Sequence, residues 1–244
     1  MKIKTHFGIY FFLMLLLTIA CNDKEDPAPV LETGTVTDVE GNSYKTVKIG
    51  DQWWMAENLK VKTYRNGVII PIITDSAGWV QSLSGAYCIY NNGNNQSNEP
   101  GILYNWNTVN NSSGLAPAGW HVPTDDEWKK LEQHLGMNAA ESDKSGWRGS
   151  NEGDKLKIES PQGWTQYQTV WATNESGFTA LAGSCRLPNA EFGQPGLFAT
   201  GFWWTSSQTG TSEAWYRYLD YKNSNVFRSH DSKLYGFSVR CVKD

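Results

Sequence analysis

Short runs in which apolar and polar residues alternate, separated by turn residues, constrain the fold of this chain most strongly. Residues 46–49, Thr-Val-Lys-Ile, alternate in this way between turn residues at 40–42 and at 50–51. The segment 213–221 alternates again, and the turn at 222–225 separates it from a returning arm. Because successive side chains of a strand point to opposite faces, these runs predict antiparallel hairpins near both ends of the folded part.

The closing segment 236–244, GFSVRCVKD, has the same period of two. It places Phe237, Val239 and Cys241 on one face and the alternate residues on the other, which predicts a core strand with its apolar face inward. The segments 60–85 and 91–101 have no such period, and we expect both to be irregular.

One helix has a complete signature, at 124–135. Thr124 is a good N-cap, Glu127 completes a capping box, and Gly136 suits the position after the helix. One apolar stripe follows the helical period: Trp128, Leu131 and Leu135. A weaker helix is expected at about 150–157. Along the chain, hairpins come first, the two helices follow, and further strands and loops close the sequence. This order predicts an α+β fold with antiparallel sheets, one or two short helices and long loops.

The same helix raises the question of a metal or acid–base site, because His121, three acids at 125–127 and His134 lie close in sequence. Consecutive side chains on a helix diverge by about 100° each, so the three acids cannot converge on one ion. The two histidines have no metal-ligand spacing. We therefore assign these acids to helix capping and to the helix dipole, and expect neither a metal nor a cofactor.

The N-terminal segment predicts where in the cell the protein is located. Lys2 and Lys4 precede an apolar run at 7–20, and Cys21 follows it. This arrangement resembles a bacterial lipoprotein signal, which implies a signal peptide at 1–20, a lipid on Cys21 and attachment to a membrane; the alternative is ordinary secretion with a free cysteine. The polar, acidic stretch at 21–33 predicts a flexible tether and resembles the export signal of surface-exposed Bacteroidetes lipoproteins of the outer membrane.

The charge composition bears on which kinds of molecule the protein binds. The chain has 21 basic and 25 acidic residues, and without Lys2 and Lys4 of the leader 19 basic residues remain against the same 25 acidic ones. The basic residues form no cluster, which argues against nucleic acid as a partner. Three cysteines remain in the folded part, Cys88, Cys185 and Cys241. They allow at most one disulfide, and all three pairings stay open.

Nine stretches of the chain follow one another in this order: VTDVEGNSYKTVKIGDQWWMAENL, GAYCIYNN, GILYNWNTV, AGWHVPTDDEWKKLE, GDKLK, ATNESGFTAL, WWTSSQ, AWYRYL and GFSVRCVKD. Together they resemble the Fibrobacter succinogenes major paralogous domain, a family of secreted and lipid-anchored proteins, over about residues 34–244. The resemblance implies a small antiparallel sheet flanked by helices, C-type-lectin-like and distantly similar to formylglycine-generating enzymes. Ala116 stands where that family is expected to have cysteine, which puts the family's disulfide in doubt.

Catalytic motifs are incomplete. Formylglycine-type oxidation needs paired cysteines near the C-terminal strands, and 202–218 contains none. The loops at 98–101 and 194–196 each lack the third residue of the calcium-linked sugar motifs Glu-Pro-Asn and Gln-Pro-Asp. The serines at 206–207 have no nucleophile-elbow pattern. The chain is therefore not expected to be an enzyme.

Aromatic residues are the remaining candidates, since 12 Trp and 11 Tyr are present. In Trp53-Trp54, in Trp203-Trp204 and in 215–218, alternation predicts one aromatic inward and one outward. Outward aromatics suit sugar rings or protein partners, although loops could cover both faces instead. The predicted recognition patch joins three residues on one face of their strand with one on the partner arm: Tyr216, Tyr218, Asp220 and Arg228.

These observations predict a lipid-anchored protein of the cell envelope with a non-catalytic binding or adhesion role toward a glycan or a protein. The alternatives are an envelope enzyme related to formylglycine-generating proteins and a structural component of the surface. In addition, Asp75-Ser76-Ala77 resembles the O-glycosylation motif of Bacteroides envelope proteins, which makes Ser76 a candidate acceptor.

Overall fold

A computed structural model describes residues 30–93, 101–160, 163–168, 170–193 and 196–244. The chain divides into two units, Met1–Val30 and Leu31–Asp244, and the fold described below is that of the second. Cys21 and the leader lie outside the described residues, as do most of the two loops tested for sugar motifs.

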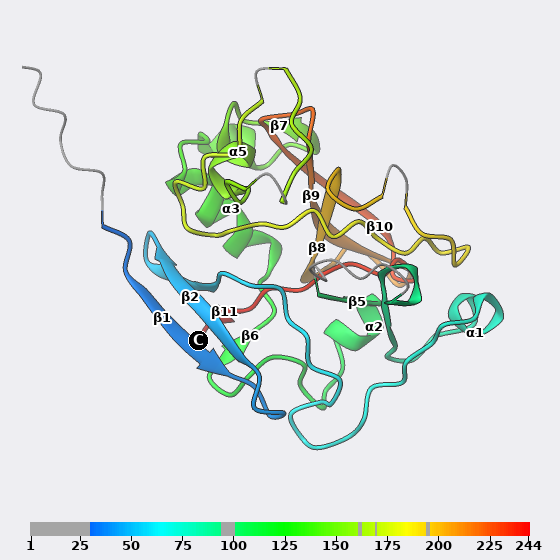
Figure 1. Ribbon diagram of the computed structural model, residues 1–244. Coiled ribbons are helices and arrows are strands. Elements are labelled where there is room, and N and C mark those ends of the chain that lie inside the picture. The colour runs from blue at the N-terminus through cyan, green and yellow to red at the C-terminus, as the bar shows by residue number, and fades with distance from the viewer. Residues whose placement is uncertain (1–29, 94–100, 161–162, 169, 194–195) are drawn as a thin grey trace, which may run out of the picture. The chain divides into compact units, whose positions relative to one another are not determined.

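Antiparallel sheets dominate this unit (Figure 1). The five-stranded sheet has the order β1-β2-β3-β11-β6, with β1 Thr33–Thr37, β2 Ser43–Ile49, β3 Gln52–Met55, β11 Val242–Lys243 and β6 Trp120–His121. The four-stranded sheet has the order β7-β10-β9-β8, with β7 Gly146–Arg148, β10 Val226–Ser232, β9 Glu213–Asp220 and β8 Thr200–Gln208. A two-stranded sheet pairs β4 Tyr87–Ile89 with β5 Ile102–Tyr104.

The helices are short: α1 Ser76–Val80, α2 Trp106–Val109, α3 Asp125–His134, α4 Ala139–Ser142, α5 Glu152–Leu156 and the 3-10 turn η1 Tyr90–Gly93. Among the described residues, none of these helices has the length and apolar character needed to cross a membrane. The α+β class with antiparallel sheets, short helices and long loops is therefore confirmed. The C-type-lectin-like detail stays a prediction.

Local sequence signals located the main elements correctly. The linked hairpins are β1, β2 and β3, and the C-terminal hairpin is β9 with β10. The helix α3 has the predicted N-cap Thr124 and a complete capping box with Glu127. In contrast, α1 lies in a segment expected to be irregular. Its signals are an N-cap, Asp75, which accepts from the Gly78 amide, and one fully buried side chain, Trp79.

The closing segment runs between the sheets through the centre of this unit (Figure 1). Phe237, Val239 and Cys241 are buried, as predicted. The other face of the segment is covered too, because Ser238 and Arg240 are buried as well. Its backbone is bonded on both sides, for example by the amides of Leu59 and Trp204, which donate to Val239 and Ser238. The regular strand β11 covers only Val242–Lys243, and the segment before it is enclosed by neighbouring segments, so it has no exterior face.

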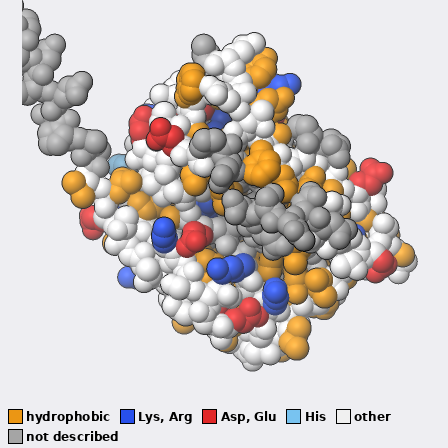
Figure 2. Space-filling view, viewed as in Figure 1, with side chains coloured by type: hydrophobic (Ala, Val, Ile, Leu, Met, Phe, Trp, Pro, Cys, Tyr) orange, Lys and Arg blue, Asp and Glu red, His pale blue; other side chains and the backbone are white. Residues whose placement is uncertain are grey.

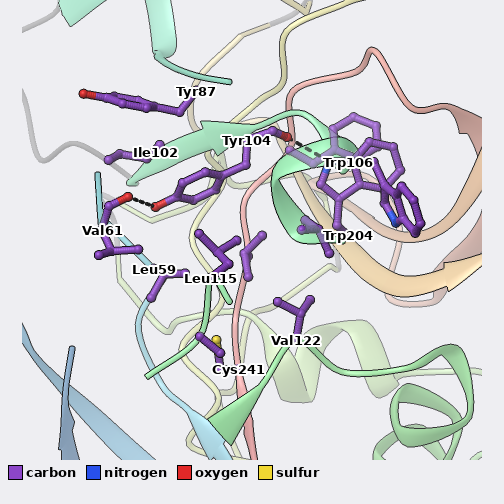
Figure 3. Close-up of a cluster of buried hydrophobic side chains, with 14 of the residues drawn as sticks. Leu59, Val61, Tyr87, Ile102, Tyr104, Trp106, Leu115, Val122, Trp204 and Cys241 are labelled. Carbon is purple, nitrogen blue, oxygen red and sulfur yellow. Dashed lines mark hydrogen bonds between the residues drawn. The ribbon is translucent and has the colours of Figure 1, made fainter. Parts of the chain in front are cut away.

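The largest apolar cluster surrounds this segment (Figure 3). Tyr104 lies at its centre and joins two parts of the fold. Its hydroxyl donates to the Val61 carbonyl at 2.7 Å, and its own carbonyl accepts from the Trp204 indole at 2.9 Å. Several of the largest fully buried side chains of this unit are aromatic, among them Trp54, Trp79 and Trp204. On the face shown in Figure 2, basic and acidic side chains are interspersed among apolar ones.

Candidate binding surface on the four-stranded sheet

Four aromatic side chains form one row across the four-stranded sheet. Strand register aligns Trp147 of β7 with Phe227 of β10, Phe227 with Tyr218 of β9, and Tyr218 with Phe202 of β8. Residues directly opposite one another in antiparallel strands share a face, so all four rings project from the same side. We call these four residues the aromatic row.

The rings of the aromatic row touch without a break. Centroid distances are 5.2 Å for Trp147 and Phe227, 5.7 Å for Phe227 and Tyr218, and 4.6 Å for Tyr218 and Phe202, whose planes stack at 13°. Trp147 is 40% exposed, and the other three rings are half-buried. Edge and stacked contacts of this kind hold rings rigidly, and a rigid half-exposed ring loses little entropy when a ligand lies on it.

Polar groups border the aromatic row. The Tyr218 hydroxyl donates to Asp220 Oδ2 at 2.5 Å, and Asp220 Oδ1 accepts from the Lys222 amide at 2.6 Å. Burial raises the pKa of Tyr218, and the hydrogen bond to Asp220 raises it further, so this hydroxyl stays protonated. A carboxylate with free lone pairs beside flat rings offers stacking together with an acceptor for ligand hydroxyls.

The opposite face of the sheet is filled by ion pairs with α3. Asp125 pairs with Arg217 Nη1 and with Arg228 Nη2, each at 2.7 Å, and Glu132 pairs with Arg217 Nε at 2.6 Å and with Arg148 Nη1 at 2.7 Å. Burial opposes the ionisation of Asp125, but the two guanidinium groups outweigh it and lower the pKa of its carboxyl. This cluster fastens the helix to the sheet.

The predicted patch is therefore divided between two faces. Tyr216, Tyr218 and Asp220 do share a face, since they alternate along β9. Arg228 does not join them, because it lies opposite Arg217 in the register and points at Asp125. Its guanidinium also lies 3.7 Å from the centroid of the Trp215 ring.

The aromatic pairs behave unequally. Trp53 is half-buried and Trp54 fully buried, as alternation predicted, but Trp203 and Trp204 are both buried. There the alternative that both faces are covered applies. Trp203 lies in a buried apolar cluster with Val47 and Trp54, and the Trp204 ring packs against Phe237. Sequence reasoning missed Trp147, Phe227 and Phe202, whose shared row depends on strand register between distant segments.

The acidic residues at the start of α3, which raised the question of a metal or acid–base site, are bonded to neighbouring side chains of the fold. Glu127 bonds to Thr124 and to His121, and the other ring nitrogen of His121 meets Asp244 at 2.7 Å. Assigning Asp125 to the helix terminus alone is wrong, since it is buried among arginines. In the part of the chain that the structure describes, no group of three His, Cys, Asp or Glu side chains is placed to hold a metal ion.

The remaining candidates can be placed individually. Cys88, Cys185 and Cys241 are all buried free thiols, so none of the three pairings is formed. Burial raises the pKa of Cys88 to about 11 and that of Cys185 to about 12. Ser76 is exposed in the first turn of α1, where a modification would be accessible.

The sequence was also compared with known proteins. The family model of the Fibrobacter succinogenes major domain matches residues 47–243. The chain belongs to this family. A search of the curated proteins and a search of the solved structures each returned no match. In this Fibrobacter succinogenes major domain the matched range contains α3, the aromatic row and the buried closing segment. It begins within β2, so β1 precedes it.

Proposed function

We propose that this protein is a non-catalytic binding protein of the cell envelope and that the aromatic row holds a glycan. The observation that carries the proposal is the continuous contact of four half-exposed rings beside Asp220. Sugar rings present flat C–H faces to aromatic rings and hydroxyl groups to carboxylates. The proposal favours a glycan over a protein ligand because the Asp220 carboxylate sits at the margin of an apolar strip of aromatic rings.

The test is a glycan array probed with the purified mature protein, followed by titration of the glycans retained. Trp147→Ala is expected to weaken binding about tenfold, since losing an aromatic contact of this kind removes roughly 0.5–1.5 kcal/mol beyond the lost area. Trp171→Ala is the matched control, because Trp171 is 58% exposed and makes no ring contact with the row among the described residues. An array without bound glycan, or equal binding by both variants, would contradict the proposal.

The proposed location of the protein, at the outer membrane, is part of the same proposal. A lipid on Cys21 would anchor the protein in the outer membrane and the tether would carry the domain outward, toward ligands at the surface. Cys21→Ala is expected to abolish incorporation of labelled palmitate and to release the protein from membranes. Protease treatment of intact cells then distinguishes the outward from the periplasmic orientation.

A further inference from the structure

The open edge of the five-stranded sheet offers unpaired backbone groups. The Lys48 amide donates to the Glu32 carbonyl at 2.9 Å, and the Asp38 amide donates to the Asn42 carbonyl at 3.0 Å. Hydrogen-bonded pairs alternate along an antiparallel ladder, so the even-numbered residues of β1 bond to β2. The N–H and C=O groups of the odd-numbered residues point outward: Thr33, Thr35 and Thr37.

This edge carries none of the usual protection. Edge strands are normally blocked by a charge, a proline, a bulge or a covering segment. The sequence of β1 is Thr-Gly-Thr-Val-Thr, without charge or proline, and its register with β2 is continuous. Its three threonines are exposed, and no described strand pairs with β1 on the outer side (Figure 1). The edge can therefore accept another strand.

A cavity of about 610 Å³ lies beside the same edge. Thr33 and Gly34 form its border on β1, and the residues facing them come from the segment 158–181. Its lining is mainly apolar, with one charge of each sign: Val47, Ala56, Ile158, Leu181, Lys45 and Glu57. The volume is within the range that protein sites use for ligand groups. A strand added next to β1 would direct alternate side chains to this face.

We infer that β1 binds an extended segment of another polypeptide by strand addition, with one apolar side chain of that segment in the cavity. In this mode backbone hydrogen bonds give affinity and a side-chain pocket gives selectivity. A second copy of this chain fits less well. Pairing β1 with itself would place only threonine side chains over an apolar cavity, because its odd-numbered residues share that face.

The test uses the mature protein and a panel of capped hexapeptides, Lys-Thr-Lys-X-Lys-Thr, in which X is Val, Leu, Phe or Asp and the lysines lie on the face opposite X. Titration calorimetry is expected to detect binding in the micromolar range for at least one apolar X and none for Asp. On binding, the amides of Thr33, Thr35 and Thr37 should exchange more slowly with deuterium. Thr35→Pro removes one outward N–H without touching the β1–β2 ladder, and it should weaken binding at least tenfold. Thr35→Val keeps that N–H and is the matched control.

A second variant tests the cavity separately. Ala56→Leu adds volume beside Val47 at the wall of the cavity and should weaken binding of the Leu and Phe peptides at least tenfold. Because Ala56 is itself buried, the melting temperature of the variant is measured in parallel, and binding is compared at a temperature where both proteins are folded. The inference is overturned if no apolar peptide binds, if Thr35→Pro binds like Thr35→Val, or if the Asp peptide binds equally well. It is also overturned if Thr35→Pro instead abolishes a concentration-dependent dimer, or if peptides bind only after deletion of residues 22–29. None of these results depends on the aromatic row.

Discussion

Single buried arginines hold the long loops of this protein in place. Arg240 donates through Nε to Asn58, through Nη1 to the Phe178 carbonyl and through Nη2 to the Thr179 carbonyl at 2.8 Å. Arg186 does the same for the carbonyls of Ile73 and Thr74. Buried loop carbonyls need donors, and a guanidinium supplies five in a fixed geometry.

Replacing Arg240 tests this role. Burial lowers its pKa to about 9, so the group stays charged at neutral pH. Arg240→Met leaves buried carbonyls without a donor, and we expect the free energy of unfolding to fall by about 3 kcal/mol. Urea denaturation measures the change, with the exposed Lys130→Met as control. A loss below about 1 kcal/mol would show that other groups or water satisfy these carbonyls.

At the scale of elements, α3 joins the two sheets. Its N-terminal end meets the five-stranded sheet through His121 of β6, and its buried acids meet the four-stranded sheet through Arg217. The helix itself follows from its cap and its stripe, which are local signals. Its position follows from ion pairs with residues about 90 positions away, such as Asp125 with Arg217.

The contact between His121 and Glu127 at the N-terminal end of α3 predicts that the stability of the fold depends on pH. Burial lowers the pKa of His121, but its bonds to Asp244 and Glu127 outweigh burial and raise it overall. A raised pKa in the folded state stabilises the protein fully below about 6.5, the unfolded value, and this contribution is lost as the pH rises through the folded value.

Urea denaturation between pH 6 and pH 8.5 checks this. Wild type is expected to lose about 0.5 kcal/mol relative to His121→Gln over that range, a small amount because the pair is partly exposed. If the free energy of unfolding changed with pH in the same way for both proteins, His121 would not be the group whose titration causes the change.

For the whole molecule, the thiols report on how tightly the unit is packed. Burial raises the pKa of all three cysteines, which keeps them in the unreactive thiol form. In Cys21→Ala protein, a thiol reagent should label none of them within minutes in the native state and all three in denaturant. Mass spectrometry counts the labels. Labelling of only one thiol after denaturation would indicate a disulfide between the other two.

The C-terminal half shows where local signals stop being sufficient. Alternation correctly placed Tyr216 and Tyr218 on one face of β9, and turn residues correctly placed β10 beside it. The same reasoning could not align Trp147 with Phe227, since that pairing joins segments about 80 residues apart. It could not assign Arg228 either, because the register with β9 decides which face that side chain takes.

The sequence by itself determined the local structure of this protein: the capped helix α3, the hairpins and the inward side of the closing segment. These depend on backbone geometry and on neighbours a few residues away. Only the tertiary structure decided what covers each face, and so which aromatics remain open, which acids are paired and where the edge of β1 is free. Burial and pairing depend on contacts between distant segments, and the period of a single strand carries no information about them.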